Sequence, residues 1–211
     1  MECHMRSHVM MGTVLLAGAS LLHAQPDRET MTDRVARLIR QLGHDDFAKR
    51  EAASKELDAI GEPALDALRK ASASDGDAEI RRRAERIVES VTGRIRAAAA
   101  KKELARWEGE WVGNGQQTLI FKGDRWAWGE PGKIDEVNGN RIVIVDLGEK
   151  AILADLLVGD PAKDGKVCKA IFRRDGDTLH YCGTYAGFYP TEFRTDANTF
   201  YVAWKRVKPM R

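Results

Sequence analysis

The chain has 211 residues, of which 43% are hydrophobic and 31% are charged. These fractions are ordinary for a folded protein and exclude a wholly disordered chain, a collagen and a multi-span membrane protein. Lys and Arg total 34 against 32 Asp and Glu, which gives a formal net charge of +2. Because a nucleic-acid-binding domain usually carries a strongly basic face, we expect no nucleic acid as partner. The length fits one or two domains.

The first residues are typical of an export signal. An apolar run over residues 9–22 follows Arg6, and Ala24 then precedes Gln25. A weakly basic start, a short apolar run and a small residue before a break are the parts of a secretory signal peptide. We expect residues 1–24 to be removed, with an uncleaved N-terminal anchor as the alternative. The mature protein would then be periplasmic or extracellular, without a membrane span.

The composition changes part-way along the mature chain. Phe47 is the single aromatic residue between the signal and Trp107, whereas residues 107–211 hold all five Trp. A shift of this kind marks a domain boundary. We therefore predict two parts, called here the helical module (residues 25–103) and the barrel domain (residues 104–211).

Apolar residues recur at helical spacing in the first part. A first helix is predicted by Val35, Leu38, Ile39 and Leu42. A second helix, capped by Asp45 or Asp46, ends at Gly61. Its apolar face consists of Phe47, Ala52, Ala53, Leu57 and Ile60. Pro63 fits the first turn of a third helix. Asp77 caps a last helix, which we expect to continue through the alanines at 97–100 to Leu104.

Residues 33–92 resemble the HEAT-like helical repeats of exported planctomycete proteins. The resemblance is carried by Phe47, Arg50-Glu51-Ala52, Leu57, Gly61, Ala64-Leu65, Leu68, Asp77, Glu79, Arg81 and Arg83-Ala84. Repeats of this type form protein-binding solenoids, so the resemblance implies a protein partner for the helical module. About one and a half units are visible, whereas stacked repeats need three or more. The module is therefore expected to pack on the second part, another copy or a partner.

The second part is predicted to consist of short antiparallel strands. We place them at residues 118–122, 125–128, 134–137, 141–147, 151–158, 167–174, 178–185, 191–195 and 199–207. Several are separated by turn signals, such as Asn138-Gly139. A closed barrel removes the exposed edges of such a set. The predicted fold class is α+β, with N-terminal helices and a C-terminal antiparallel barrel.

A Gly-x-Trp motif opens the barrel domain. Gly109 and Trp111 stand on the predicted first strand, and Arg206 shares one face of the last strand with Trp204. This pattern resembles the lipocalin arrangement, in which cation–π stacking of the arginine on the tryptophan closes one end of the barrel. The resemblance implies a structural role for Gly109, Trp111 and Arg206.

A wider pattern extends this resemblance over residues 104–207. It comprises Leu104, Trp107, Phe121-Lys122-Gly123-Asp124, Lys166, Ala170-Ile171-Phe172, Asp175-Gly176-Asp177-Thr178-Leu179, Tyr181-Cys182, Pro190-Thr191-Glu192-Phe193 and Lys205-Arg206. These residues resemble the planctomycete lipocalin-like domain of unknown function. The resemblance implies a barrel fold and carries over no catalytic residues.

Two cysteines remain after removal of the signal, Cys168 and Cys182, and export would place them in an oxidising compartment. They flank the turn at 175–177, so hairpin pairing brings them together to within about two residues of register. The spacing fits either a cross-strand disulfide or two buried free thiols.

Few residues of the mature chain are candidates for catalytic nucleophiles, bases or metal ligands. It retains His44 and His180, whereas a zinc site normally needs three or four His, Cys or carboxylate ligands. Residues 107–211 contain no Ser, which excludes a Ser–His site inside the barrel. We expect no enzyme activity, no metal and no cofactor. The alternative is a hydrolase that uses carboxylates or the pair of His180 and Cys182. Asp155 interrupts an apolar strand and points either into the barrel or to solvent.

Aromatic residues are the candidates for ligand binding. Trp126 and Trp128 share one strand face, and Tyr185, Phe188 and Tyr189 cluster near a loop. They predict an aromatic-lined pocket at the barrel mouth, with ordinary core packing as the alternative. An eight-stranded barrel either fills with side chains or holds one small ligand, and five Trp favour filling.

These observations predict a non-catalytic binding or scaffold protein of the cell envelope. The helices would form a protein-interaction surface, and the barrel would be an interaction platform. The alternative is a carrier or sensor of a small apolar ligand held in the barrel.

Overall fold

A computed structural model of the protein describes residues 29–113, 117–130, 140–159 and 165–207. The predicted signal peptide and the predicted strand at 134–137 lie outside these residues. The helices are α1 (Met31–Gln41), α2 (Phe47–Ile60), a 3₁₀ turn (Glu62–Ala64), α3 (Leu65–Ser74) and α4 (Ala78–Trp107). The strands are β1 (Gly109–Val112), β2 (Thr118–Lys122), β3 (Arg125–Gly129), β4 (Arg141–Leu147), β5 (Ile152–Val158), β6 (Lys166–Asp175), β7 (Thr178–Thr184) and β8 (Phe200–Arg206). The predicted fold class, α+β with N-terminal helices and an antiparallel barrel, is confirmed.

The helices begin where the sequence supplies caps. The Asp46 carboxylate accepts a hydrogen bond from the Ala48 amide at 2.8 Å and so caps α2. Asp77 does the same for α4, accepting from the Glu79 amide at 2.8 Å. Each cap satisfies a backbone donor that has no partner within its helix.

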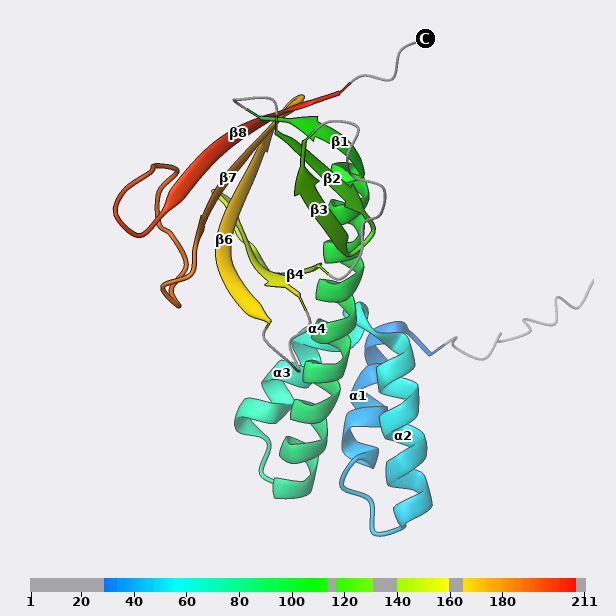
Figure 1. Ribbon diagram of the computed structural model, residues 1–211. Coiled ribbons are helices and arrows are strands. Elements are labelled where there is room, and N and C mark those ends of the chain that lie inside the picture. Colours follow the sequence, from blue (N-terminus) through cyan, green and yellow to red (C-terminus); the bar gives the residue numbers. More distant parts are fainter. Residues whose placement is uncertain (1–28, 114–116, 131–139, 160–164, 208–211) are drawn as a thin grey trace, which may run out of the picture.

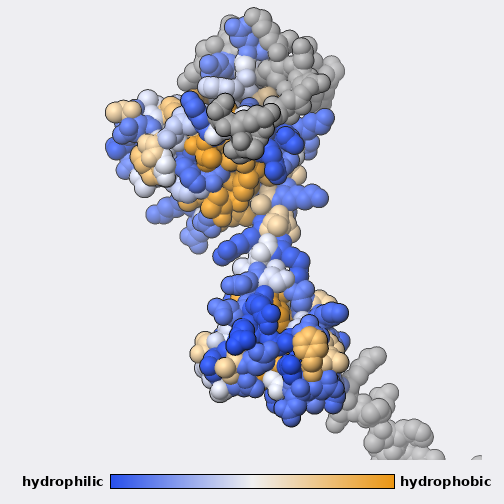
Figure 2. Space-filling model, turned by 60° about the horizontal axis from the view of Figure 1, so that its bottom comes forward, coloured by the Kyte–Doolittle hydropathy of each residue, from blue (hydrophilic) through white to orange (hydrophobic). Residues whose placement is uncertain are grey.

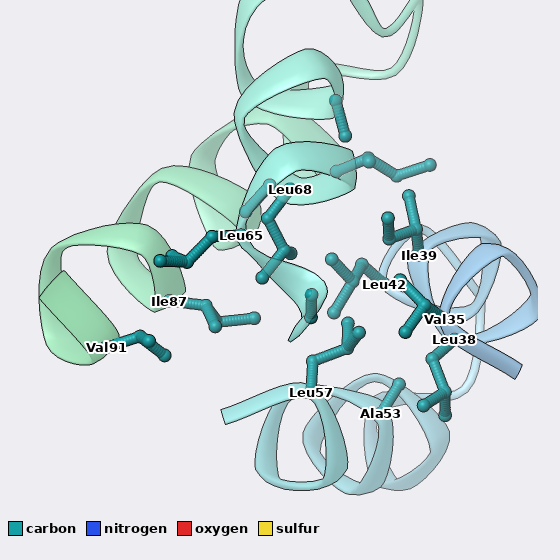
Figure 3. Packing of buried hydrophobic residues seen from close by; sticks show 14 residues of the cluster. Val35, Leu38, Ile39, Leu42, Ala53, Leu57, Leu65, Leu68, Ile87 and Val91 are labelled. Carbon is teal, nitrogen blue, oxygen red and sulfur yellow. The ribbon is translucent and has the colours of Figure 1, made fainter. Parts of the chain in front are cut away.

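The core of the helical module is aliphatic (Figure 3). It contains Val35, Leu38, Ile39, Leu42, Ala53, Ala64, Leu57, Leu65, Leu68, Ala71, Ile80, Ala84, Ile87 and Val91. Phe47, which we expected on this apolar face, is instead 62% exposed. It is the first residue of α2, and its ring packs under the Arg50 guanidinium at 5.5 Å, outside the core.

Helix α4 connects the two parts of the molecule. Figure 1 shows its first half beside α1–α3 and its second half entering the barrel. Ile87 and Val91 belong to the helical core, whereas Leu104 and Trp107 belong to the barrel core. Between them, residues 93–98 are exposed. The continuous helix predicted from the alanine tract is confirmed, and it joins two separate cores.

The eight described strands form one closed antiparallel barrel in chain order, from β1 to β8. The barrel closes where Trp111 of β1 pairs with Arg206 of β8. The β3–β4 seam is narrow, because Arg125 and Arg141 are its one paired position among the described residues. The predicted strand at 191–195 is wrong: this segment is a loop. Its end is held by Arg194, whose carbonyl oxygen accepts a hydrogen bond from the Thr199 hydroxyl at 2.9 Å.

Of the two arrangements that the sequence allows for Cys168 and Cys182, the disulfide is wrong and the two buried free thiols are confirmed, since both cysteines are free and buried. The register places Cys182 opposite Ile171, three residues from Cys168. Side chains alternate between the two faces of a strand. Cys168 therefore lies in the barrel core, 3.4 Å from the Tyr181 hydroxyl, and Cys182 lies on the outer face, 3.3 Å from the Arg194 carbonyl oxygen.

The surfaces of the two parts differ. Figure 2 shows an apolar area on the barrel and a mainly hydrophilic surface on the helical module. None of the described helices has the length and apolarity that a membrane span requires.

Candidate ligand cavity

The barrel interior contains a cavity of about 260 Å³. Its walls come from six strands and from Tyr185, just after β7. The lining residues are Leu119, Phe121, Trp126, Trp128, Leu156, Cys168, Phe172, Tyr181, Tyr185, Phe200 and Trp204. The expectation of a completely filled interior is therefore wrong. Rigid rings that project inward from several strands leave a space that no described side chain occupies.

Aromatic rings dominate this lining. Eight of the eleven residues are Phe, Tyr or Trp, and none of the eleven carries a charge at neutral pH. Tyr181 packs at 5.1 Å from Phe172 and at 5.6 Å from Phe200, measured between ring centroids. Such contacts hold the rings in fixed orientations. The cavity is therefore a preformed apolar space.

One end of the barrel is closed by helix α4. Trp107, the last residue of the helix, packs 4.7 Å from the ring of Phe172. Its backbone carbonyl accepts a hydrogen bond from the Trp111 indole at 2.7 Å. The Arg206 guanidinium lies 4.4 Å from the Trp111 ring centroid, which is the stacking that the resemblance to lipocalins implies. Gly109 has φ +116°, a conformation that favours glycine.

The cavity reaches solvent beside two of its lining residues. Trp128 is 54% exposed and Tyr185 is 55% exposed. The Tyr185 ring stacks on Phe200, with centroids 6.1 Å apart, and so fixes the start of the β7–β8 loop against the barrel wall. Trp126, Trp128 and Tyr185, three of the predicted ligand-binding residues, thus line the same space.

Phe188 and Tyr189, the other two predicted residues, do not line the cavity. Phe188 is exposed. The Tyr189 hydroxyl donates to Asp155, and Lys169 donates to both Asp155 carboxylate oxygens at 2.9 Å. We call Asp155, Lys169 and Tyr189 the outer latch. Since Asp155 lies on the outer face of β5, the latch fastens the β7–β8 loop to the outside of the barrel.

The contacts of the outer latch shift the pKa values of two of its residues. The hydrogen bonds that Lys169 donates to Asp155 raise the pKa of the lysine above its ordinary value, so the lysine stays protonated. Burial, followed by the hydrogen bond to Asp155, raises the pKa of the Tyr189 phenol. Lys169 is therefore cationic and Tyr189 neutral at neutral pH, and both lie outside the cavity.

The polar atoms at the cavity stay neutral. Burial is the main cause that raises the pKa of the Cys168 thiol and of the Tyr181 phenol. Gly183 leaves room for this pair, because a Cβ there would lie 2.8 Å from the Cys168 sulfur. Protonated thiol and phenol groups are poor nucleophiles. These two side chains can donate hydrogen bonds to a ligand, and their raised pKa values do not favour attack on it.

His180 and Cys182 share the outer face but have separate partners. The His180 Nδ1 lies 2.8 Å from the Tyr201 hydroxyl, and its Nε2 lies 3.2 Å from Asp175. Cys182 contacts the Arg194 carbonyl oxygen, and burial raises the pKa of its thiol. This geometry does not place the imidazole as a base for the thiol. Within the described part of the chain, no cluster of three or more His, Cys, Asp or Glu is arranged to hold a metal ion.

No known protein family, curated protein or solved structure matches this chain. The functional argument therefore rests on the cavity itself.

The sequence did not identify most of the residues that line the cavity. The two-residue alternation of β8 places Phe200 and Trp204 on one face, and that of β7 places Leu179 and Tyr181 together. That signal identifies inward residues. It does not separate Leu179, which is packed in the core, from Tyr181, which borders the cavity.

Proposed function

We propose that the protein binds a small apolar molecule in the barrel cavity, as a carrier or a sensor. One observation carries the proposal: a preformed cavity of about 260 Å³, lined by eight aromatic residues and no charged residue. Ligand sites are typically concave and apolar, with few polar groups. An apolar cavity that water does not stabilise is a favourable place for an apolar ligand.

Two further parts of the proposal rest on the sequence. Its N-terminal pattern supports export, and its helical pattern supports a protein partner for the HEAT-like module. Met31 and Phe47 are 51% and 62% exposed on that module, and a protein interface would bury such side chains. Phe47→Ser should then release a co-purifying protein without unfolding the helices, as measured by circular dichroism. A partner that is retained by this variant would contradict a contact at Phe47.

The cavity proposal can be tested by native mass spectrometry of the protein purified gently from its own host. We expect a bound small mass that leaves on mild activation. Leu156→Phe adds bulk to a lining residue and should abolish this mass. Val143→Phe is the matched control, because Val143 is 41% exposed on the adjacent strand and faces outward.

The proposal fails if two results occur together. The wild-type protein would carry no small molecule from its host, and it would also take up no small hydrocarbon, such as tetralin, in a ligand-observed NMR titration. A mass retained equally by Leu156→Phe would also contradict it, since that ligand would be bound elsewhere.

A further inference from the structure

A second hollow lies outside the barrel cavity, where helix α4 enters the barrel (Figure 1). It is a groove of about 450 Å³, bordered by the last two turns of α4, the β4–β5 turn and the end of β6. We call this space the junction groove. Its volume lies within the ~300–1,000 Å³ that is usual for small-molecule sites. Five of its thirteen lining residues are Lys or Arg and two are Glu.

Helix α4 turns one face toward the junction groove. Four of its residues, at spacings of three and four, line the groove: Ala99, Lys102, Glu103 and Arg106. The Glu103 carboxylate is already used, because it accepts hydrogen bonds from the Trp107 indole at 3.0 Å and from Arg106 at 2.8 Å. Lys102 has no carboxylate partner among the described residues.

The barrel supplies three further cations. Lys150 lies in the β4–β5 turn, and Arg173 and Arg174 lie at the end of β6. Arg173 is paired with Asp175 at 3.1 Å. Arg174 donates to the Gly176 carbonyl oxygen at 3.4 Å. In the part of the chain that the structure describes, neither Lys150 nor Arg174 has a carboxylate within ion-pair distance.

The junction groove therefore carries an excess of positive charge. Lys102, Lys150 and Arg174 lack a carboxylate partner, and Glu149 is the one lining carboxylate without a cationic partner among the described residues. Two positive charges are left in excess. The formal charge of the whole chain is only +2, so this excess is not part of a generally basic surface. A cleft lined by charges of one sign concentrates ions of the opposite sign.

The groove also offers apolar surface to a ligand. Leu147 is 39% exposed and lines the groove together with the half-buried Ile152. An inorganic anion would leave this surface in contact with water, whereas an anion with an apolar part would cover it. An organic anion is therefore the better match.

We propose that the junction groove binds a small organic dianion, namely a phosphate monoester or a dicarboxylate with an apolar part. Its acidic groups bind among Lys102, Lys150 and Arg174, and its apolar part covers Leu147. This inference does not depend on the proposed function, because the groove and the barrel cavity share only Phe172 among their lining residues.

Four probes separate charge from apolar contact. Phenyl phosphate and phthalate are dianions with one ring at about pH 7.5, inorganic phosphate lacks the ring, and benzyl alcohol lacks the charge. Each is titrated into the ¹⁵N-labelled full chain at low salt, and amide chemical shifts are followed by NMR. We expect phenyl phosphate and phthalate to shift the amides of residues 99–106 and 148–151, and benzyl alcohol to leave them unchanged.

The two dianions distinguish the possible acidic groups. Tighter binding of phenyl phosphate identifies a phosphate monoester as the ligand, and tighter binding of phthalate identifies a dicarboxylate. Added NaCl should weaken the binding of both, because salt screens charges that are exposed to solvent. Inorganic phosphate should bind more weakly than phenyl phosphate, because it cannot cover Leu147.

Adjacent lysines of α4 provide a matched pair of variants. Lys102→Gln removes a lining charge and should weaken binding of phenyl phosphate about two- to fivefold, the usual effect of one exposed charged contact. Lys101→Gln removes the same charge from an exposed residue that does not line the groove, so binding should be retained. Lys102→Arg keeps the charge and should also retain binding. The double variant Lys102→Gln/Lys150→Gln should show a larger loss than either single variant.

Two results would overturn the proposal. In the first, neither dianion shifts the amides that border the groove. In the second, Lys101→Gln and Lys102→Gln weaken binding equally, which would make the effect one of net charge. Inorganic phosphate that binds as tightly as phenyl phosphate overturns the apolar part of the ligand. None of these results bears on the proposed function, which is tested with uncharged molecules in the barrel cavity.

Discussion

The helical module and the barrel fill their interiors with different side chains. The core of the helical module contains only Val, Leu, Ile and Ala residues. The barrel core holds Trp, Phe and Tyr rings and still encloses about 260 Å³ of space. Small branched side chains adapt to each other and close a core, whereas large rigid rings on a curved sheet leave gaps. The helical module therefore has a filled core, whereas the barrel has room for a ligand.

Charged contacts outside the cores differ in the same way. In the helical module, Arg83 of α4 reaches Glu51 of α2 at 2.7 Å, and Arg94 of α4 reaches Asp58 of α2 at 2.8 Å. These pairs join elements of the scaffold. In the barrel, the outer latch holds a loop. The charges thus reinforce the module and position one side of the cavity mouth.

The largest effect is expected where the two parts meet. Trp107 is completely buried at the end of α4, so Trp107→Ala should lower the free energy of unfolding by about 3–5 kcal/mol. It should also separate the unfolding of the barrel, followed by tryptophan fluorescence, from that of the helices, followed by circular dichroism. All five Trp lie in residues 107–211, so fluorescence reports the barrel domain.

Lys101→Ala is the control for this prediction, because Lys101 is exposed on the same helix. It should change the free energy of unfolding by less than about 0.5 kcal/mol. Coincident transitions in Trp107→Ala would show that the ring does not couple the two cores.

The next largest effect compares the two interiors directly. Leu57 is fully buried in the filled helical core, and Leu57→Ala should cost about 3–4 kcal/mol of unfolding free energy. Leu156 is 3% exposed but borders the cavity, so it loses fewer contacts, and Leu156→Ala should cost about 2 kcal/mol. Urea unfolding measures both. A larger loss for Leu156→Ala would contradict an unfilled barrel.

This contrast also explains what the sequence could predict. Leu38 in α1 and Leu57 in α2 each lie at helical spacing from other apolar residues. The apolar face of such a helix is its buried face, so the pattern located these buried residues directly. The prediction that Phe47 lies on this apolar face was wrong, because spacing alone does not show that the side chain of the first residue of a helix can lie outside the core. The aromatic residues from Trp107 onward likewise indicated that the second part of the chain differs from the first, although α4 runs across the predicted boundary and ends at Trp107.

The cavity could not be predicted, because it depends on how rings from different strands meet. Trp126 and Trp107 both face inward, yet one lines the cavity and the other closes the end of the barrel. Tyr189 joined the predicted site through its place near Tyr185 in the sequence, whereas the structure turns it outward to Asp155. The spacing could not decide between a disulfide and free thiols for a related reason, since an odd shift in register reverses the face, and Cys182 pairs three residues away from Cys168.

A smaller effect is expected from the interhelical charges. Arg83 is 7% exposed and donates to Glu51 and Glu79, so Arg83→Met should lower the free energy of unfolding by about 1–2 kcal/mol. Arg82→Met is the control: its side chain is 68% exposed and 3.5 Å from Glu79. That variant should be nearly neutral. If chemical denaturation gives the same loss of unfolding free energy for both variants, the burial of Arg83 contributes nothing to stability.

The smallest effect is a pH dependence of opposite sign in the two parts. In the helical module, the hydrogen bonds from Arg83 hold the pKa of Glu51 and of Glu79 below their ordinary value of 4.5. A carboxyl whose pKa is lowered by folding stabilises the protein above its unfolded pKa and loses this contribution as the pH falls. The difference in melting temperature between wild type and Arg83→Met should therefore shrink below about pH 4.5.

The barrel should show the reverse. Folding raises the pKa of Lys169 and of Tyr189, so their contribution is present below their unfolded pKa values, near 10, and is lost as the pH rises through the folded values. The melting temperatures of wild type and Tyr189→Phe should therefore converge above about pH 10 and remain apart at pH 7. Tyr201→Phe is the matched control, since Tyr201 hydrogen-bonds His180 outside the latch. A gap for Tyr189→Phe that stays constant into the alkaline range would mean that the latch does not hold the loop through these protons.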